Sequence, residues 1–269
     1  MELNKNKSKM PNFQSFTIDF LTRYFQQITV YLIATVLVYS VFYIILKKKF
    51  LRRYIGRHFP DQNKIKFEIF HSLISRIIFS ILIVIVAYSS SLGQTKIYTE
   101  INQYGLGWFF LSGIILILWH DTYFYWVHRL FHNIHFFKYI HHLHHRSSNP
   151  TPFASNSFDP IEAFLEALPI VIAIYVIPLH PAIILFWDVF QFGVNIYGHL
   201  GFEMLSSCFT KHWFWGWFNS STHHNMHHTH FNTNFGLYFN FWDRVMGTNH
   251  PDYHNTFESI HERALDYQI

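Results

Sequence analysis

Two short stretches of this chain are rich in histidine, whose imidazole ring binds metals. Residues 119–146 hold eight of the 21 histidines, and residues 222–230 hold five more. A neutral imidazole nitrogen is a common ligand for iron, zinc, copper and nickel. These residue types therefore point to metal chemistry, and the rest of the chain must bring the two stretches together.

The spacing of the histidines predicts that they share helix faces. Residues three and four positions apart lie on one face of a helix, and three clusters have this spacing. They are His128 and His132, then His141, His144 and His145, then His224, His227 and His228. One zinc takes only three or four such ligands. The eight rings therefore predict two metals, with His199 as a ninth ligand.

Other interpretations of these histidines are weaker. A lone histidine is more often a core or surface residue than a ligand, and a His-rich tract can be a loose metal-binding tail. Such tails do not usually repeat a His-x-x-His-His spacing between apolar segments. The single cysteine, Cys208, rules out a disulfide framework and a cysteine-rich zinc site. Metal ligands must then be His, Asp or Glu.

Composition places the histidines in a membrane protein. Hydrophobic residues make up 50% of the chain and charged residues 13%, against about 25% charged residues in a soluble domain. Three apolar stretches are long enough to cross a bilayer. They are Ile28–Leu46, Phe67–Leu92, and Leu106–Trp119 with a helical continuation through Val127.

Two further apolar stretches, Ile161–Ile177 and Ala182–Ile196, flank Pro178-Leu-His-Pro181 and predict a helical hairpin. The basic run Lys47–Arg53 follows the first span, and the positive-inside rule places it in the cytoplasm. Counting crossings puts the histidines on the same side. The predicted fold is an all-α integral-membrane bundle of three long spans plus a helical hairpin, with a His-rich helical cap on the cytoplasmic side.

The chain divides by composition into four segments. We expect a polar N-terminus and lead-in helix over 1–27, two transmembrane helices with their loops over 28–105, a catalytic domain over 106–250, and a C-terminal tail over 251–269. No short apolar core with a cleavage site occurs near the start, so we expect no removable signal peptide. The net charge of +4 comes from clustered juxtamembrane residues, and we expect no nucleic-acid partner.

At this point the motifs resemble a known family. The runs His128-Arg-Leu-Phe-His132, His141-His-Leu-His-His145 and His224-Asn-Met-His-His228 are similar to the histidine boxes of the fatty acid hydroxylase/sterol desaturase superfamily. Segments 149–155, 178–181 and 234–244 resemble its sterol desaturase branch, of the lathosterol oxidase type. The likeness covers about residues 106–250 and is weak or absent before them. Two positions depart from the family pattern, because Asp159 and Asn195 stand where relatives often have histidine.

The resemblance implies two iron ions, for which zinc can substitute on purification, and O2 as co-substrate. It implies hydroxylation or desaturation of an unactivated C–H bond of a lipid. Electrons must come from a separate donor, cytochrome b5-like or a ferredoxin, because the sequence has no Gly-rich dinucleotide loop, haem motif or cysteine set. The membrane would be the endoplasmic reticulum in a eukaryote or the inner membrane in a bacterium.

Carboxylates should orient the ligating rings. The candidates are Asp121, Asp159, Asp188 and Asp243. We select Asp121 and Asp188 as catalytic-site residues, Asp188 because a charge among apolar membrane residues is costly and tends to be functional. A sterol or sterol-like lipid is the expected substrate. Fatty-acyl, alkyl-ether or carotenoid lipids are the alternatives within the enzyme class. A non-enzymatic membrane metal- or lipid-binding protein is the alternative outside it.

Overall fold

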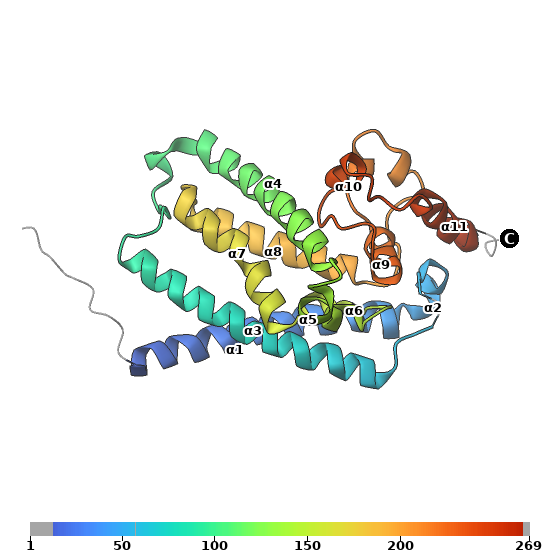
Figure 1. Ribbon diagram of the computed structural model, residues 1–269, viewed down its shortest axis with the longest axis horizontal. Helices are drawn as coiled ribbons and strands as arrows, with labels where there is room; N and C mark the ends of the chain where they lie inside the picture. The colour runs from blue at the N-terminus through green and yellow to red at the C-terminus, as the bar shows by residue number, and fades with distance from the viewer. Residues whose placement is uncertain (1–12, 57, 266–269) are drawn as a thin grey trace, which may run out of the picture.

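A computed structural model describes residues 13–56 and 58–265 of the chain, and regular structure in these residues is helical apart from isolated bridges. Five long helices form an elongated bundle (Figure 1). They are α1 (Phe13–Tyr39), α3 (Gln62–Ser91), α4 (Gly105–Phe131), α7 (Pro160–Val176) and α8 (Pro181–Gly198). The α7–α8 pair lies between α4 on one side and α3 with α1 on the other. The predicted all-α bundle is confirmed.

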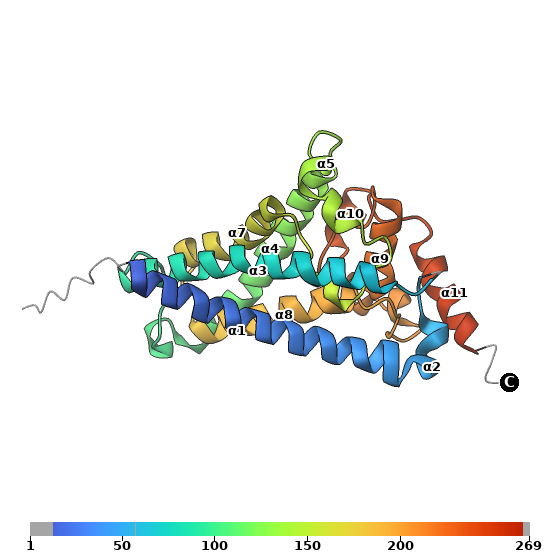
Figure 2. The same ribbon diagram turned by 90° about the horizontal axis from the view of Figure 1, so that it is seen from below.

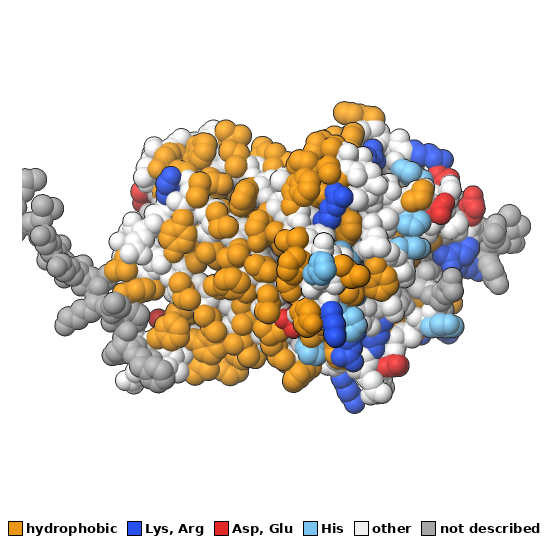
Figure 3. All heavy atoms as spheres, viewed as in Figure 1, with side chains coloured by type: hydrophobic (Ala, Val, Ile, Leu, Met, Phe, Trp, Pro, Cys, Tyr) orange, Lys and Arg blue, Asp and Glu red, His pale blue; other side chains and the backbone are white. Residues whose placement is uncertain are grey.

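Three helices are long and apolar enough to cross a membrane, as the sequence predicted. The candidate spans are Gln14–Ile45, Gln62–Ser91 and Gly105–Phe131. Apolar side chains cover most of the bundle surface, while basic and histidine side chains gather toward one end (Figure 3). The expected lead-in helix is the first part of α1, which continues without a break through the first span and into the π-helix η1 (Ser40–Ile45). Most of the expected polar N-terminus lies outside the described residues.

Two prolines and the residues that precede them set where the two helices of the hairpin begin. Asp159 caps α7 by accepting a hydrogen bond from the Ile161 N–H at 3.0 Å, and Pro160 follows at the first helical position, where its missing N–H costs nothing. His180 and Pro181 begin α8 in the same way. The predicted Pro-rich connection therefore ends one helix and starts the next.

A proline inside α7 leaves a carbonyl that another helix uses. Pro169 has no N–H, so the Leu165 carbonyl lacks its usual helical donor. The Tyr123 hydroxyl of α4 donates to that carbonyl at 2.9 Å, and the Trp119 indole N–H donates to the Pro169 carbonyl at 2.9 Å. These two bonds join α4 to α7 inside the bundle.

Short helices cover one end of the bundle. The cap contains α2 (Lys47–Phe50), η2 (Leu51–Arg53), α5 (Phe137–Ile140), α6 (His142–His145), α9 (Ser221–His230), α10 (Phe241–Val245) and α11 (Tyr253–Leu265), with 3-10 turns η5 (Phe209–Lys211) and η6 (Trp215–Trp217). The 3-10 turn η4 (Pro152–Asn156) instead packs on α1, α3 and α8 of the bundle. The α3–α4 loop, with η3 (Ile101–Gln103), lies at the opposite end (Figures 1 and 2). The basic loop and the histidines therefore share one end, as predicted.

The expected C-terminal tail is a helix over most of its length. Helix α11 packs on η2 and on α9. Its Phe257 and Ile260 side chains are buried, and Tyr253 donates a hydrogen bond to the Ser220 hydroxyl at 3.0 Å. This segment is thus part of the cap. The exposed face of α11 is polar, so the segment has no continuous apolar stretch that would have predicted this amphipathic helix.

Candidate metal centre

The nine predicted histidines form two groups in the cap. The first group contains His128, His132, His141, His145 and His227, and the second contains His144, His199, His224 and His228. Within each group, one ring nitrogen from each residue lies within 4.8 Å of all the others. Helix α4, the α5–α6 segment, the end of α8 and helix α9 supply the rings. Because α9 contributes to both groups, the two groups are adjacent.

Short contacts in the first group join ring nitrogens to ring nitrogens. The Nε2 atoms of His128 and His141 are 2.9 Å apart. The Nε2 atom of His145 lies 3.1 Å from that of His132 and 3.0 Å from that of His227. Five rings from three separate segments thus point the same atom at one centre.

The second group repeats this geometry. The Nε2 atom of His199 is 3.3 Å from that of His144 and 3.1 Å from that of His224. The Nε2 atoms of His224 and His228 are also 3.1 Å apart. His199, which follows the last turn of α8, therefore belongs to the second group.

The hydrogen bond made by the other ring nitrogen, Nδ1, determines whether Nε2 is free to bind a metal. Backbone carbonyls only accept hydrogen bonds, so a ring that faces one must carry its proton on Nδ1. Such carbonyls lie beside His128 (Phe235, 2.9 Å), His199 (Asn195, 2.7 Å), His227 (Thr233, 2.8 Å) and His144 (Ser157, 3.3 Å). Their Nε2 atoms therefore present lone pairs to the centre of each group.

This arrangement fits a metal. Lone pairs that face one another at about 3 Å repel, and a cation between them turns the repulsion into coordination. Burial lowers the pKa of His144, His227 and His228 well below the usual value, so these rings stay neutral, which is the ligating form. A set of imidazoles without thiolate suits iron, copper, nickel or zinc.

Glu162 is a site residue that the sequence analysis missed. Its side chain is 1% exposed, and one carboxylate oxygen accepts a hydrogen bond from Nδ1 of His141 at 2.6 Å. A carboxylate in this place fixes the ring and makes Nε2 a stronger donor to a metal. Glu162 stands in an apolar helix, as Asp188 does, so a charge among apolar residues is the sequence signal for both.

The predicted carboxylates have other partners. Asp121 accepts hydrogen bonds from the N–H groups of Tyr238 and Phe239, at 2.8 and 3.2 Å. Asp243 accepts from the N–H groups of Phe235 and Gly236, both at 2.8 Å. These two residues hold the loop whose Phe235 carbonyl anchors His128.

Asp159 and Asp188 lie away from the rings. Asp159 caps α7, and Asp188 lines a cavity in the bundle. Among the described residues, no hydrogen bond joins any of the four predicted aspartates to a ring of either histidine group. An orienting role for Asp121 or Asp243 would therefore act through the backbone of the loop.

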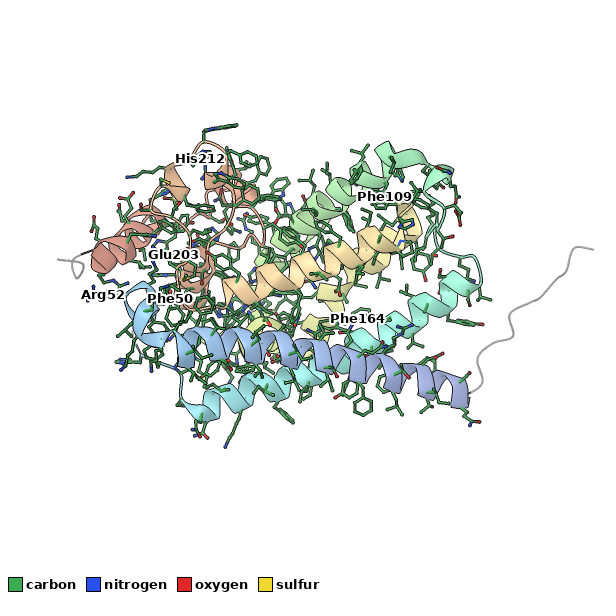
Figure 4. All side chains as sticks on the ribbon, turned by 180° about the vertical axis from the view of Figure 1, so that it is seen from behind. Phe50, Arg52, Phe109, Phe164, Glu203 and His212 are labelled. Atoms are coloured by element: carbon green, nitrogen blue, oxygen red, sulfur yellow. The ribbon has the colours of Figure 1, made fainter. Side chains whose placement is uncertain are left out.

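Glu203 positions the helix that supplies three of the rings. Its buried carboxylate accepts hydrogen bonds from the N–H and the hydroxyl of Thr222, at 3.1 and 2.7 Å, in the first turn of α9. Tyr197 donates to the other carboxylate oxygen at 3.0 Å. Figure 4 shows Glu203 inside the cap, near Phe50 and Arg52 of the basic loop. A negative charge at this helix start is favourable because unpaired N–H groups gather there.

A cavity of about 810 Å³ runs through the bundle beside the histidines. Residues of α1, α3, α4, α7 and α8 line it. Two lining side chains also touch the site, since the Phe124 ring is 4.9 Å from that of His128 and the Phe158 ring is 5.2 Å from that of His144. Cavities of about 300–1,000 Å³ hold drug-sized ligands. The volume is sufficient for a lipid of several rings or a folded chain.

The sequence is similar to several curated proteins that are named as sterol desaturases or lathosterol oxidases. It is 30% identical over 188 residues to a Delta(7)-sterol 5(6)-desaturase of Gibberella zeae, a match that covers 70% of this chain and 57% of that protein. It is 35% identical over 162 residues to the lathosterol oxidase of Rattus norvegicus, covering 59% and 52%. The human lathosterol oxidase is 31% identical over 158 residues, covering 58% and 51%.

These relatives are longer than the region that they share with this protein. The chain spans about half the length of the curated relatives it matches. No solved structure matches it. The sequence model of the fatty acid hydroxylase family matches residues 113–248, which include all nine histidines of the two groups. The chain therefore belongs to the fatty acid hydroxylase family.

Proposed function

We propose that this protein is a membrane-bound, O2-dependent di-iron lipid oxidase. The observation that carries the proposal is the pair of buried all-histidine groups beside a large cavity in an apolar bundle. His128, His132, His141, His145 and His227 would hold one iron, and His144, His199, His224 and His228 the other. Bound iron would supply the activation of O2 that attack on an unactivated C–H bond requires.

The chain itself contributes position and shielding. Carbonyl anchors hold four rings with Nε2 inward, and Glu162 holds a fifth. Phe124 and Phe158 stand between the cavity and the rings, which keeps the reacting carbon in an apolar setting. Exclusion of water limits side reactions of reactive species. Asp121, through the loop that it holds, is a positioning residue in this proposal.

A sterol or sterol-like lipid is the proposed substrate. The named activities of the similar proteins, a Delta(7)-sterol desaturase and lathosterol oxidases, favour this class, and the cavity volume admits it. The reaction is either hydroxylation or loss of two hydrogens to give a double bond. Fatty-acyl, alkyl-ether and carotenoid lipids are the competing substrates that product analysis separates.

An external one-electron donor, cytochrome b5-like or a ferredoxin, would reduce the metals. We place its docking surface at the cap end, where the basic run Lys47–Arg53, in α2 and η2, offers a partner for an acidic protein (Figure 1). This end would face the cytoplasm, in agreement with the excess of Lys and Arg beside the first span.

The test is lipid mass spectrometry under 18O2. Cells expressing the wild-type chain are compared with cells expressing His228→Ala, and His135→Ala is the matched control because His135 is exposed and outside both groups. A new lipid that requires His228 but not His135 establishes the oxidase. Label in that lipid means hydroxylation, and an unlabelled product lighter by two hydrogens means desaturation. Absence of any new lipid, with sterols and a donor supplied, favours a metal- or lipid-binding protein.

A further inference from the structure

A buried cation lines the cavity halfway along one of the candidate membrane spans. Arg76 lies at the middle of α3 and its side chain lines the cavity, although the residue is only 9% exposed. Its guanidinium donates to the side-chain oxygens of Gln27 on α1 and Asn156 in η4, both at 2.6 Å. A charge at this depth is costly and is retained where it serves a function.

The hydrogen-bonding capacity of Arg76 is incompletely used. Arginine has five N–H donors, yet Nε is buried without a hydrogen-bond partner. Among the described residues, no carboxylate lies within 4.0 Å of the guanidinium. The rings of Tyr31 and Phe192 cover it at 5.3 and 5.0 Å. The cation therefore has unsatisfied donors beside an open volume.

Acceptors line the same cavity from the opposite helices. Asp188 and Gln191 of α8 lie together, with the Gln191 amide 3.5 Å from the Asp188 carboxylate, and Glu166 of α7 is a third polar lining residue. The lining holds two carboxylates, Glu166 and Asp188, and two guanidinium groups, Arg76 and the exposed Arg23. The cavity therefore has no excess of positive charge and does not favour an anionic ligand. A hydroxyl group, which donates once and accepts twice, matches donors on one wall and acceptors on the other.

We propose that Arg76 and Asp188 bind the hydroxyl group of the lipid substrate inside the membrane and so position it for oxidation. This inference rests on the proposed oxidase function and adds the polar group that the enzyme recognises. Arg76 donates a hydrogen bond to the hydroxyl oxygen. Asp188, supported by Gln191, accepts a hydrogen bond from the hydroxyl group. The rest of the cavity wall is mainly apolar and surrounds the skeleton.

Helix α8 sets the distance from this hydroxyl site to the metal centre. Phe192, which packs on Arg76, and Asn195, whose carbonyl anchors His199, follow Asp188 at steps of three or four residues and share its helix face. His199 follows Asp188 by eleven positions, which is roughly 16 Å of helix. A second connection runs through η4, where Asn156 bonds Arg76 and the next residue anchors His144. A substrate hydroxyl bound between Arg76 and Asp188 determines which carbon of the lipid lies next to the histidine rings.

The experiment measures binding, and so does not depend on turnover. The purified protein in lipid nanodiscs is titrated with a Delta(7)-sterol that has a free 3-hydroxyl and with its 3-deoxy analogue. A second pair, 1-octadecanol and octadecane, presents the same difference on another skeleton. The variants are Asp188→Leu and Arg76→Met, and Asp252→Leu on the exposed cap surface is the control. Asp188 makes only one long side-chain bond, so its variant keeps the fold even if Arg76→Met does not.

We expect the wild type and the control to bind the hydroxylated sterol about 10-fold or more tightly than its deoxy analogue, since a site built for a hydroxyl rejects a ligand without one. Asp188→Leu should bring that ratio close to one. Equal binding of both members of each pair by the wild type overturns the hydroxyl site, and sterol oxidation in the same preparation would leave the oxidase function standing. A preference confined to the octadecanol pair, and lost in Asp188→Leu, keeps the hydroxyl site and excludes the sterol substrate.

Discussion

At the scale of single residues, the contact between Glu162 and His141 has the most direct consequence for metal binding. The 2.6 Å hydrogen bond fixes the ring from behind, and the buried carboxylate raises the donor strength of Nε2. Four other rings are anchored by neutral carbonyls, and among the described residues His141 is the one ring of the two groups with a carboxylate partner.

Replacing Glu162 by Gln, a side chain of similar size, should therefore weaken the metal site without disturbing the packing of the bundle core. We expect metal affinity to fall about 10- to 100-fold, the usual effect of removing such a partner. Metal content after dialysis against graded chelator measures this. The exposed Glu262 provides the control variant, Glu262→Gln. Unchanged metal retention in Glu162→Gln would show that the carboxylate does not act on the ring.

Spacing in the sequence predicted the histidines but not the carboxylate. The rings recur three and four residues apart, and a helix converts that interval directly into a shared face. Glu162 meets His141 across 21 residues through a loop, and no local period encodes such a contact. Asp121 was chosen from its residue type and Asp188 because it is a charge among apolar residues, and the structure gives them loop-holding and cavity-lining positions.

At the scale of secondary structure, helix α9 contributes to both histidine groups. Its first turn depends on Glu203, which accepts from the Thr222 N–H and hydroxyl. Long apolar spans were predictable because roughly 20 uncharged residues have few alternatives to crossing a bilayer. The support of α9 was not predictable, since Glu203 lies 19 residues away from Thr222 and no local period encodes such a contact.

Replacing Glu203 by Ala should destabilise α9 and reduce occupancy of both metal groups together. Loss of a buried acceptor that leaves its donors unpaired costs about 1–3 kcal/mol. Thr222→Val, which removes one of the two bonds from Thr222, should have a smaller effect of the same kind. Thermal unfolding and metal stoichiometry measure both. Loss of metal from only one group would contradict the role assigned to α9.

The buried histidines of α9 should also make the cap sensitive to acid. Burial lowers the pKa of His223 to about 4, and it lowers the pKa of His224 and His227 well below the usual value. The unfolded chain, with histidine pKa values near 6.5, then binds more protons than the folded chain. Stability therefore rises with pH over this range and is lost as the pH falls from about 6.5 toward about 4.

Metal-free protein is the suitable sample for this measurement, because bound metal would add its own pH dependence. Hydrogen exchange of residues 221–230 should speed up as the pH falls through this window, after correction for intrinsic exchange rates. Protection that stays constant down to pH 4 would contradict the expectation.

At the scale of the whole molecule, the two groups act as crosslinks between parts of the fold that are distant in sequence. The first group joins α4, α6 and α9, and the second joins α6, α8 and α9. A ligand that binds only the folded state stabilises it by about 2.7 kcal/mol at a concentration 100 times Kd. Removing metal with a chelator should therefore lower the unfolding temperature of the cap.

Adding Fe²⁺ without oxygen should restore that temperature, and Zn²⁺ should do so in part. The variant His135→Ala, outside both groups, should respond as the wild type does, whereas His228→Ala should respond less. An unfolding temperature that is the same with and without metal would mean that the facing rings do not hold an ion.

The participation of α9 in both groups has a consequence for how the protein is made. Ribosomes deliver the chain from its N-terminus, so the three candidate spans and the hairpin emerge before residue 221. Neither group can close until α9 has left the ribosome, because each takes ligands from it. The complete set of ligands for either centre is therefore available only after all the candidate spans have been synthesised. A nascent chain arrested before residue 221 would insert its spans and still be unable to complete either centre.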